Sequence, residues 1–180
     1  MSFQRDFIDN NSKAVIRASK GTGIFPSVSM AQMIIESGWG KDTLPRKYNN
    51  YFGIKKGSGW NGRTVWLPTP NDAKPYSEFR VYNNSQESIK DHISFLQKNK
   101  RYEKNGVFNS RTPEQQLYAL KRAGYAESAN YAPALINLIY DYNLKSLDKQ
   151  RSGIVINKKV VIPILLFGSV LLILKEERIL

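Results

Sequence analysis

The feature that most constrains the fold is an almost uncharged run that ends in a single carboxylate. Residues 30–40 read Met-Ala-Gln-Met-Ile-Ile-Glu-Ser-Gly-Trp-Gly, and Glu36 is their one charged side chain. Ser27 lies upstream as a suitable N-cap, so we predict a buried helix over about residues 28–36. A carboxyl at the end of such a helix is partly desolvated, which raises its pKa and suits it to general acid catalysis near neutral pH. The alternative is a structural helix that merely ends in Glu-Ser-Gly.

Bulk composition fits one folded domain and argues against several kinds of site. The 180 residues include no cysteine and one histidine, so a thiolate metal site, a structural zinc site and a Ser-His-Asp triad are not expected. No cofactor or metal is expected either. The net charge of +12 favours a polyanionic partner such as nucleic acid, anionic lipid or an anionic cell wall. The basic residues are scattered and form no nucleic-acid motif, so no nucleic-acid partner is expected.

Apolar periodicity predicts a mainly helical chain. Helices are expected over residues 3–19, from residue 85 onward, after an N-cap at Thr112 followed by proline, and from about residue 130.

Residues 48–82 are different, because they are rich in Gly, Asn, Pro, Thr and aromatic residues. This composition indicates a small β-lobe with long loops. Asn61-Gly62 is typical of a hairpin turn. Trp60 and Trp66 beside it are either exposed platforms or a cross-strand pair.

The C-terminal part of the sequence predicts a tether to a membrane. Residues 146–159 are polar and read as a linker, whereas residues 160–174 are uncharged. As a helix the uncharged run is about 22 Å long, short for a hydrocarbon core of about 30 Å, but flanking lysines can reach the interfaces. We therefore expect a C-terminal apolar transmembrane helix, the alternative being a buried terminal helix or strand. No secretory signal is visible at the N-terminus, and the membrane topology stays open.

Short sequence blocks carry a family resemblance over residues 1–145. They are Ala31–Gly40, Asn49–Lys55, Phe79–Tyr82, and Tyr125-Ala126 with Asn130–Ala132. In this order the blocks resemble glycoside hydrolase family 73, the bacterial endo-β-N-acetylglucosaminidases that cut peptidoglycan. The resemblance implies a lysozyme-like α+β fold, mainly helical, with a small β-hairpin lobe.

The resemblance also implies a set of catalytic residues. It makes Glu36 the general acid that protonates the glycosidic oxygen, and it places Tyr131 in the active site to orient water or the acetamido group. The family's second acid, on the β-lobe, is absent at the closest alignment, so Asp72 and Glu78 are the candidates. Otherwise the substrate's own N-acetyl oxygen acts as the nucleophile. Tyr131 could instead be a core aromatic residue.

The substrate-binding residues implied by the resemblance are Asn50, Tyr51, Phe52 and Gly53, which would shape the cleft floor. Trp39 is expected to pack beneath Glu36 and desolvate it. His92 shares a helix face with apolar residues and is expected to be a core histidine.

These expectations combine into a peptidoglycan hydrolase of the bacterial cell envelope, bound to glycan strands and tethered to the membrane through residues 160–174. One alternative is a non-catalytic peptidoglycan-binding module on the same fold, with activity lost near Thr69–Asp72. Another is a structural membrane protein whose basic face binds anionic lipid.

Overall fold

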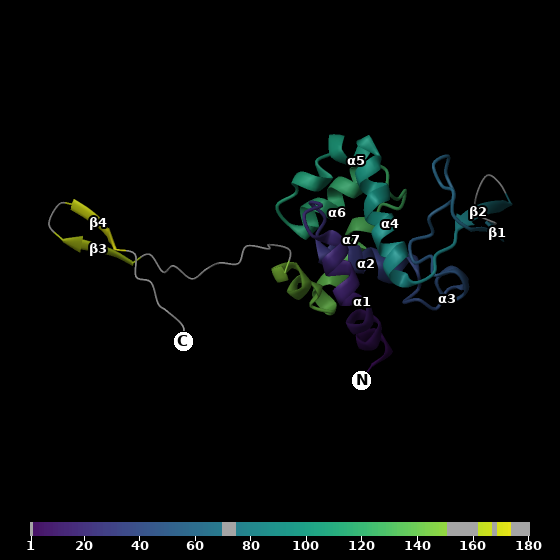
Figure 1. Ribbon diagram of the computed structural model, residues 1–180, viewed down its shortest axis with the longest axis horizontal. Helices are drawn as coiled ribbons and strands as arrows, with labels where there is room; N and C mark the ends of the chain where they lie inside the picture. Colours follow the sequence, from purple (N-terminus) through teal and green to yellow (C-terminus); the bar gives the residue numbers. More distant parts are fainter. Residues whose placement is uncertain (1, 70–74, 151–161, 167–168, 174–180) are drawn as a thin grey trace.

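The computed structural model describes residues 2–69, 75–150, 162–166 and 169–173 (Figure 1). Asp72 lies outside the described residues. The helices are α1 (Phe3–Ser19), α2 (Pro26–Glu36), α3 (Thr43–Tyr48), α4 (Ser85–Lys98), α5 (Lys100–Lys104), η1 (Val107–Asn109), α6 (Pro113–Arg122), α7 (Tyr131–Asp141) and η2 (Leu144–Gln150). The strands are β1 (Thr64–Pro68), β2 (Tyr76–Arg80), β3 (Ile162–Leu166) and β4 (Ser169–Ile173). The prediction of a mainly helical fold with a small antiparallel hairpin is confirmed.

Helix α2 lies at the centre of the helical body (Figure 1). All of its residues from 26 to 34 are buried, and it contacts α1, α6, α7 and η2. A helix that is apolar around its whole circumference must be covered on every side, which is why an uncharged run becomes the core helix. The helix begins at Pro26, two residues before the predicted start, so Ser27 lies in its first turn rather than at the N-cap.

The first turn of α2 is capped by a residue from the far end of the domain. The Asp148 carboxylate in η2 accepts hydrogen bonds from the Ser27 backbone N–H (2.8 Å) and from Ser27 Oγ (2.7 Å). Leu144 of the same helix is buried, and Leu147 packs against the core. Residues 146–150 therefore belong to the folded domain, where the sequence predicted the start of a linker. Leu144 and Leu147 are three residues apart, which suits one face of a 3₁₀ helix.

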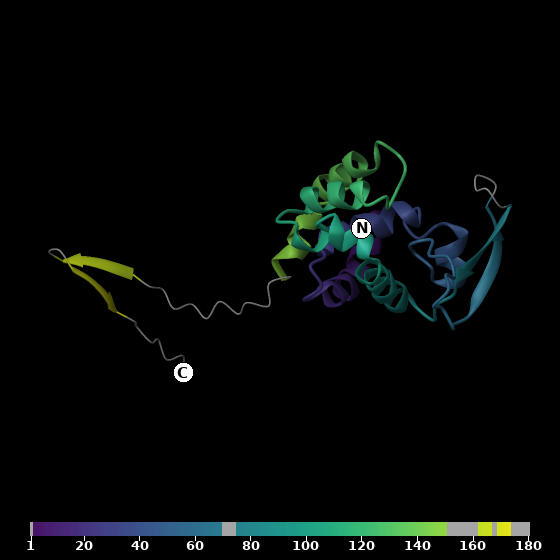
Figure 2. The same cartoon turned by 90° about the horizontal axis from the view of Figure 1, so that it is seen from above.

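The hairpin β1–β2 stands to one side of the helices (Figure 2). Its strands are antiparallel, with Thr64 opposite Arg80 and Trp66 opposite Glu78. The predicted turn at Asn61-Gly62 is wrong, because those residues precede β1. There the Trp60 indole N–H folds back to donate to the Arg63 carbonyl (3.1 Å).

The two lobe tryptophans are not a cross-strand pair. Trp66 is 64% exposed on β1. Trp60 packs edge-on against Tyr82, with the Arg80 guanidinium over its ring.

Strands β3 and β4 pair antiparallel, with Ile162 opposite Ile173. The helix predicted over residues 160–174 is therefore wrong for the described part of that range. Ile162, Ile164, Val170 and Ile173 are β-branched, and such residues favour strands over helices. Among the residues that the structure describes, no helix combines the length and apolarity needed to cross a bilayer.

The Asp148 cap gives a test of whether η2 is part of the domain. Asp148→Ala removes the acceptor for two Ser27 donors and should lower the free energy of unfolding by about 1–2 kcal/mol. Chemical denaturation of the full chain measures this loss. Lys149→Ala, at the exposed neighbouring position, is the matched control, and equal stability of the two variants would contradict the assigned role.

Candidate active site

Glu36 is the last residue of α2, and a tight turn fixes the direction in which the chain leaves it. Ser37 Oγ donates to the Met33 carbonyl (2.6 Å) and accepts from the Gly40 N–H (2.8 Å). The three residues 38–40 are all left-handed, with φ of 53°, 60° and 74°. Glycine adopts this conformation readily, which accounts for the Gly-Trp-Gly sequence after the acid.

Two hollows flank the Glu36 side chain. The larger, of about 660 Å³, lies between the β-lobe and the helices that follow it. Its lining is Glu36, Phe52, Gly53, Ile54, Lys55, Gly57, Arg80, His92, Phe95, Arg101, Tyr102, Tyr125 and Ala126. The smaller, of about 370 Å³, is lined by Glu36, Asp42, Thr43, Leu44, Leu67, Pro68 and Phe79. An extended chain could therefore pass on both sides of the carboxyl group.

Burial raises the pKa of Glu36 from 4.5 to about 7. The carboxyl also lies at the C-terminal end of α2, where the negative end of the helix dipole disfavours a carboxylate. Glu36 consequently retains its proton in a large fraction of molecules near neutral pH, as expected of a general acid.

The surroundings of Glu36 are tyrosines rather than the predicted tryptophan. Trp39 packs edge-on against Phe7 (5.9 Å between ring centroids) and Tyr142 (4.8 Å), and it lines a separate hollow with Phe7. Burial, and in addition the charge of the Glu36 carboxylate, raise the pKa of both Tyr125 and Tyr131. The two phenols therefore remain protonated beside the acid.

On one side of Glu36, hydrogen bonds and aromatic ring contacts connect a series of buried side chains that leads away from the acid. Gln32 Nε2 donates to Tyr131 Oη (2.9 Å), and the Tyr131 ring lies 5.6 Å from that of Tyr125. Tyr125 Oη is 3.1 Å from His92 Nε2, and His92 stacks on Phe52 at 3.9 Å. Burial lowers the pKa of His92 to about 3, so its imidazole is neutral and belongs to the core, as expected.

The four predicted binding residues separate into two pairs. Phe52 and Gly53 line the larger hollow with Glu36. Tyr51 lies on the other side of the loop, where its ring packs against Phe7. Asn50 is fully buried.

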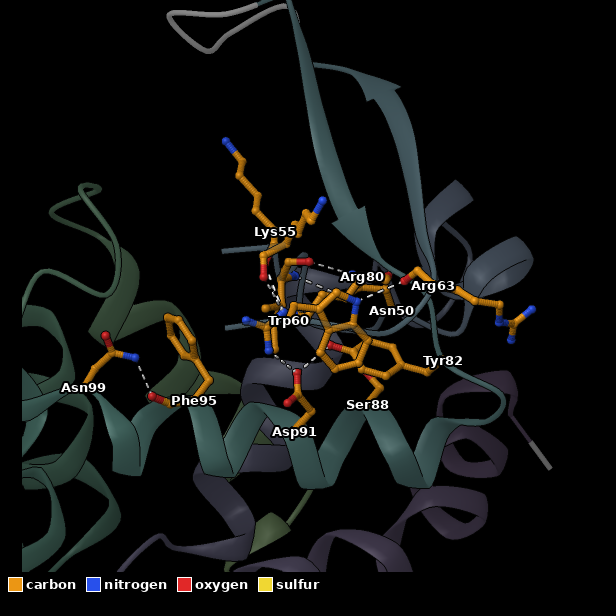
Figure 3. A network of polar contacts seen from close by, with 12 residues as sticks. Asn50, Lys55, Trp60, Arg63, Arg80, Tyr82, Ser88, Asp91, Phe95 and Asn99 are labelled. Carbon is orange, nitrogen blue, oxygen red and sulfur yellow. Dashed lines mark hydrogen bonds and ion pairs between the residues drawn. The ribbon is translucent and has the colours of Figure 1, made fainter. Parts of the chain in front are cut away.

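The Asn50 side chain holds the neighbouring loop in place through hydrogen bonds to the backbone (Figure 3). Its Nδ2 donates to the carbonyls of Ile54 (3.0 Å) and Arg80 (2.9 Å), and its Oδ1 accepts from the Ile54 N–H (3.1 Å). This network fixes the loop that carries Phe52 and Gly53.

Arg80 joins the lobe to the helical body (Figure 3). Its Nη1 forms an ion pair with Asp91 of α4 (2.8 Å), and its Nε donates to the carbonyls of Lys55 and Lys56 (both 3.1 Å). Tyr82 Oη donates to the same Asp91 oxygen (2.7 Å). The wall of the larger hollow therefore depends on a salt bridge that the sequence did not reveal.

Glu78 lines neither hollow. Its carboxylate accepts from Thr64 Oγ1 (2.6 Å) and pairs with Lys56 Nζ (3.3 Å). The hydrogen bond from Thr64 and the contact with Lys56 hold its pKa below the usual range.

Three residues near the acid were missed as site residues. Gln32 lies four residues before Glu36, so helical spacing alone could have placed it on the same face. Tyr125 appeared only as part of a family block. Asp42 lines the smaller hollow with Glu36, and no pattern in the sequence distinguishes it from other surface acids.

The raised pKa of Glu36 has a consequence for stability. The folded protein binds more protons than the unfolded chain between pH 4.5 and about 7, so this group destabilises the fold as the pH rises through that window. Replacement by glutamine removes the effect. From pH 4.5 to pH 8 the unfolding free energy of Glu36→Gln should rise relative to wild type by about 2–3 kcal/mol.

Parallel denaturation of wild type and variant over this range measures the difference. Glu103→Gln, on exposed surface in α5, is the matched control. A difference that is constant with pH would contradict the desolvated state of Glu36.

Comparison with known proteins agrees with this geometry. A glucosaminidase family model, described as mannosyl-glycoprotein endo-beta-N-acetylglucosaminidase, matches residues 12–144. The peptidoglycan hydrolase FlgJ of Salmonella typhimurium is 32% identical over 157 residues, which is 82% of this chain and 48% of FlgJ. The exo-glucosaminidase LytG of Bacillus subtilis is 29% identical over 154 residues, or 81% of this chain and 54% of LytG. The chain spans about half the length of these relatives.

Solved structures show the same fold. The glycoside hydrolase domain of Salmonella typhimurium FlgJ has a TM-score of 0.66 at 32% identity, covering 81% of this chain and 91% of that domain. The catalytic domain of the autolysin Auto from Listeria monocytogenes has a TM-score of 0.69 at 30% identity, covering 82% and 89%. Together with the match over residues 12–144, these likenesses show that the chain belongs to the glucosaminidase family, the glycoside hydrolases of family 73.

Proposed function

We propose that this chain hydrolyses the β-1,4 bond of N-acetylglucosamine in peptidoglycan, with Glu36 as the general acid. The observation that carries the proposal is one partly desolvated carboxyl group, with a pKa near 7, between two hollows. Relatives of this chain are the peptidoglycan hydrolase FlgJ and the exo-glucosaminidase LytG, which supports the proposed substrate and bond. Because peptidoglycan lies in the bacterial cell envelope, the proposed location of this activity is the envelope.

The geometry suits cleavage within a glycan strand. With sugars in both hollows, the glycosidic oxygen lies near Glu36, whose proton moves to that oxygen as the bond to the anomeric carbon breaks. A nucleophile stabilises the positive charge that develops at the anomeric carbon, and a water molecule then adds to that carbon and returns a proton to Glu36. Hollows on both sides of the acid favour endo-cleavage, since a strand can continue in both directions.

The second group is proposed to be the substrate's own acetamido oxygen, with Tyr131 in support. Tyr131 Oη accepts from Gln32 Nε2, so its own O–H is left to donate toward the acid or the acetamido group. Glu78 is engaged by Thr64 and Lys56, which supports a role in holding the lobe together. Asp72 remains the other candidate on the lobe. Attachment to a membrane through residues 160–174 has no support in the described residues.

Digestion of purified peptidoglycan tests the proposal. Wild type should release fragments with N-acetylglucosamine at the reducing end, identified by mass spectrometry after reduction. Glu36→Gln, which cannot protonate the leaving oxygen, should lower the rate about 10²–10⁴-fold while circular dichroism stays unchanged.

Two other results would change the assignment. Binding of peptidoglycan by wild type without any cleavage would favour the non-catalytic binding module. A loss in Glu78→Gln or Asp72→Asn as large as that in Glu36→Gln would identify a lobe carboxylate as the second group and reject the acetamido route.

A further inference from the structure

Two exposed aromatic residues lie together on the β-lobe. Trp66 of β1 is 64% exposed and Tyr76 of β2 is 54% exposed. Trp66 lies opposite Glu78, and Tyr76 lies opposite Pro68, so both aromatic side chains belong to the same face of the hairpin. They are diagonal neighbours across the two strands, about 7–8 Å apart between Cα atoms.

Two other exposed aromatic rings are covered by a lysine. Lys41 Nζ lies 4.2 Å from the centre of the Phe3 ring, and Lys145 Nζ lies 4.5 Å from the centre of the Tyr140 ring. No ring or cation covers Trp66 or Tyr76 within the described part of the chain. Two adjacent uncovered rings make a contiguous apolar patch, and such patches mark interaction surfaces more often than single exposed residues do.

The charged groups beside these rings already have partners. Glu78 accepts from Thr64 Oγ1 (2.6 Å) and pairs with Lys56 Nζ (3.3 Å). The face therefore presents ring surface rather than an open charge, which suits a neutral ligand. The face of a pyranose ring carries C–H groups of slight positive charge, and these complement the negative face of an aromatic ring.

The same face of the hairpin begins inside the larger hollow beside Glu36. Arg80 lines that hollow and lies opposite Thr64, in the row of the hairpin next to Trp66. Tyr76 lies one row further, and each step of two residues along a strand covers about 7 Å. In Figure 3 the two strands extend from Arg80 away from α4. A glycan strand that leaves the hollow along the lobe would meet Trp66 first and Tyr76 next.

We propose that Trp66 and Tyr76 form a platform that binds sugar rings of the glycan beyond the larger hollow, so that long glycan strands bind more tightly than short ones. This inference rests on the proposed function. The hollows hold the sugars on either side of the bond that is cut, and the platform holds a more distant part of the same strand. Its contribution is confined to ligands long enough to reach it.

Binding to glycans of two lengths tests the inference. The full chain carrying Glu36→Gln, which leaves the glycan uncut, is titrated with long peptidoglycan strands and with a tetrasaccharide of the same glycan. Trp66→Thr and Tyr76→Thr keep a high β-propensity, and each should weaken binding of the long strands about fivefold, the size of one lost ring contact. Binding of the tetrasaccharide should stay unchanged. An equal loss with both ligands, or no loss with the long strands, would overturn the inference.

Control variants separate the platform from general loss of aromatic surface. Tyr118→Ala removes an exposed ring (47%) on α6 that lines neither hollow, and it should keep the affinity for long strands. Trp66→Phe keeps a ring and should retain most of that affinity. Dimerisation of the chain that Trp66→Thr abolishes would assign the rings to a second copy of the chain and would reject the glycan platform.

The Trp66 indole gives a readout on the unaltered lobe. Its Nε1–H resonance in the NMR spectrum, assigned by its loss in Trp66→Phe, should shift when long strands are added and stay in place with the tetrasaccharide. If the tetrasaccharide binds but long strands leave this resonance unmoved, the platform is rejected and the proposed function stands. Failure of both glycans to bind would reject the proposed function together with the inference.

Discussion

The complete burial of helix α2 is the constraint on which the rest of the molecule depends. Residues 26–34 are buried on every side, so the helix cannot rotate or slide without exposing apolar surface. Asp148 holds its first turn, and the left-handed turn at residues 38–40 fixes its last. Glu36 therefore emerges at one defined point, at the edge of the core. The same burial that orients the carboxyl group also raises its pKa, so position and protonation have one cause.

The second part of the site depends on a different kind of interaction. The β-lobe has little apolar core of its own, and hydrogen bonds and one ion pair hold it against the helices. Asn50 joins the end of β2 to the loop of Phe52, and Arg80 joins the lobe to Asp91 of α4. Both hollows beside Glu36 have one wall from this lobe. Because the lobe is attached through few contacts, these polar residues set the width of the cleft, although neither Asn50 nor Asp91 lines the two hollows.

The sequence predicts local features well where periodicity or capping determines them. Helix α6 begins as expected, with Thr112 Oγ1 accepting from the Gln115 N–H, and the uncharged run becomes the buried α2. Contacts between residues that are far apart in the sequence could not be predicted from it. Asp148 and Ser27 are 121 positions apart, and a polar stretch gives no sign that one carboxylate caps a distant helix. The hairpin turn was misplaced because Asn61-Gly62 satisfies a local rule while the indole of Trp60 closes that loop differently.

At the site, the sequence identified Glu36 and two of its neighbours but not the whole lining. Phe52 and Gly53 line the larger hollow with Glu36, whereas the ring of the adjacent Tyr51 packs against Phe7. Arg101 of α5 and Tyr125 in the loop after α6 line the hollow from separate segments, and Gln32 of α2 contacts Tyr131 of α7, so only the packing of the fold brings them near the acid. Family resemblance supplied the role of Tyr131, and the structure adds its hydrogen bond to Gln32 and its place beside Tyr125.

The central claim is that Glu36 is a carboxylic acid that keeps its proton near neutral pH. Carbon NMR of glutamate-labelled protein, with the Glu36 resonance assigned by its loss in Glu36→Gln, measures this directly. The account predicts a titration midpoint at about pH 7 for this carboxyl group. A midpoint near the ordinary value of 4.5 would show that Glu36 is well solvated, and it would contradict its assignment as the general acid.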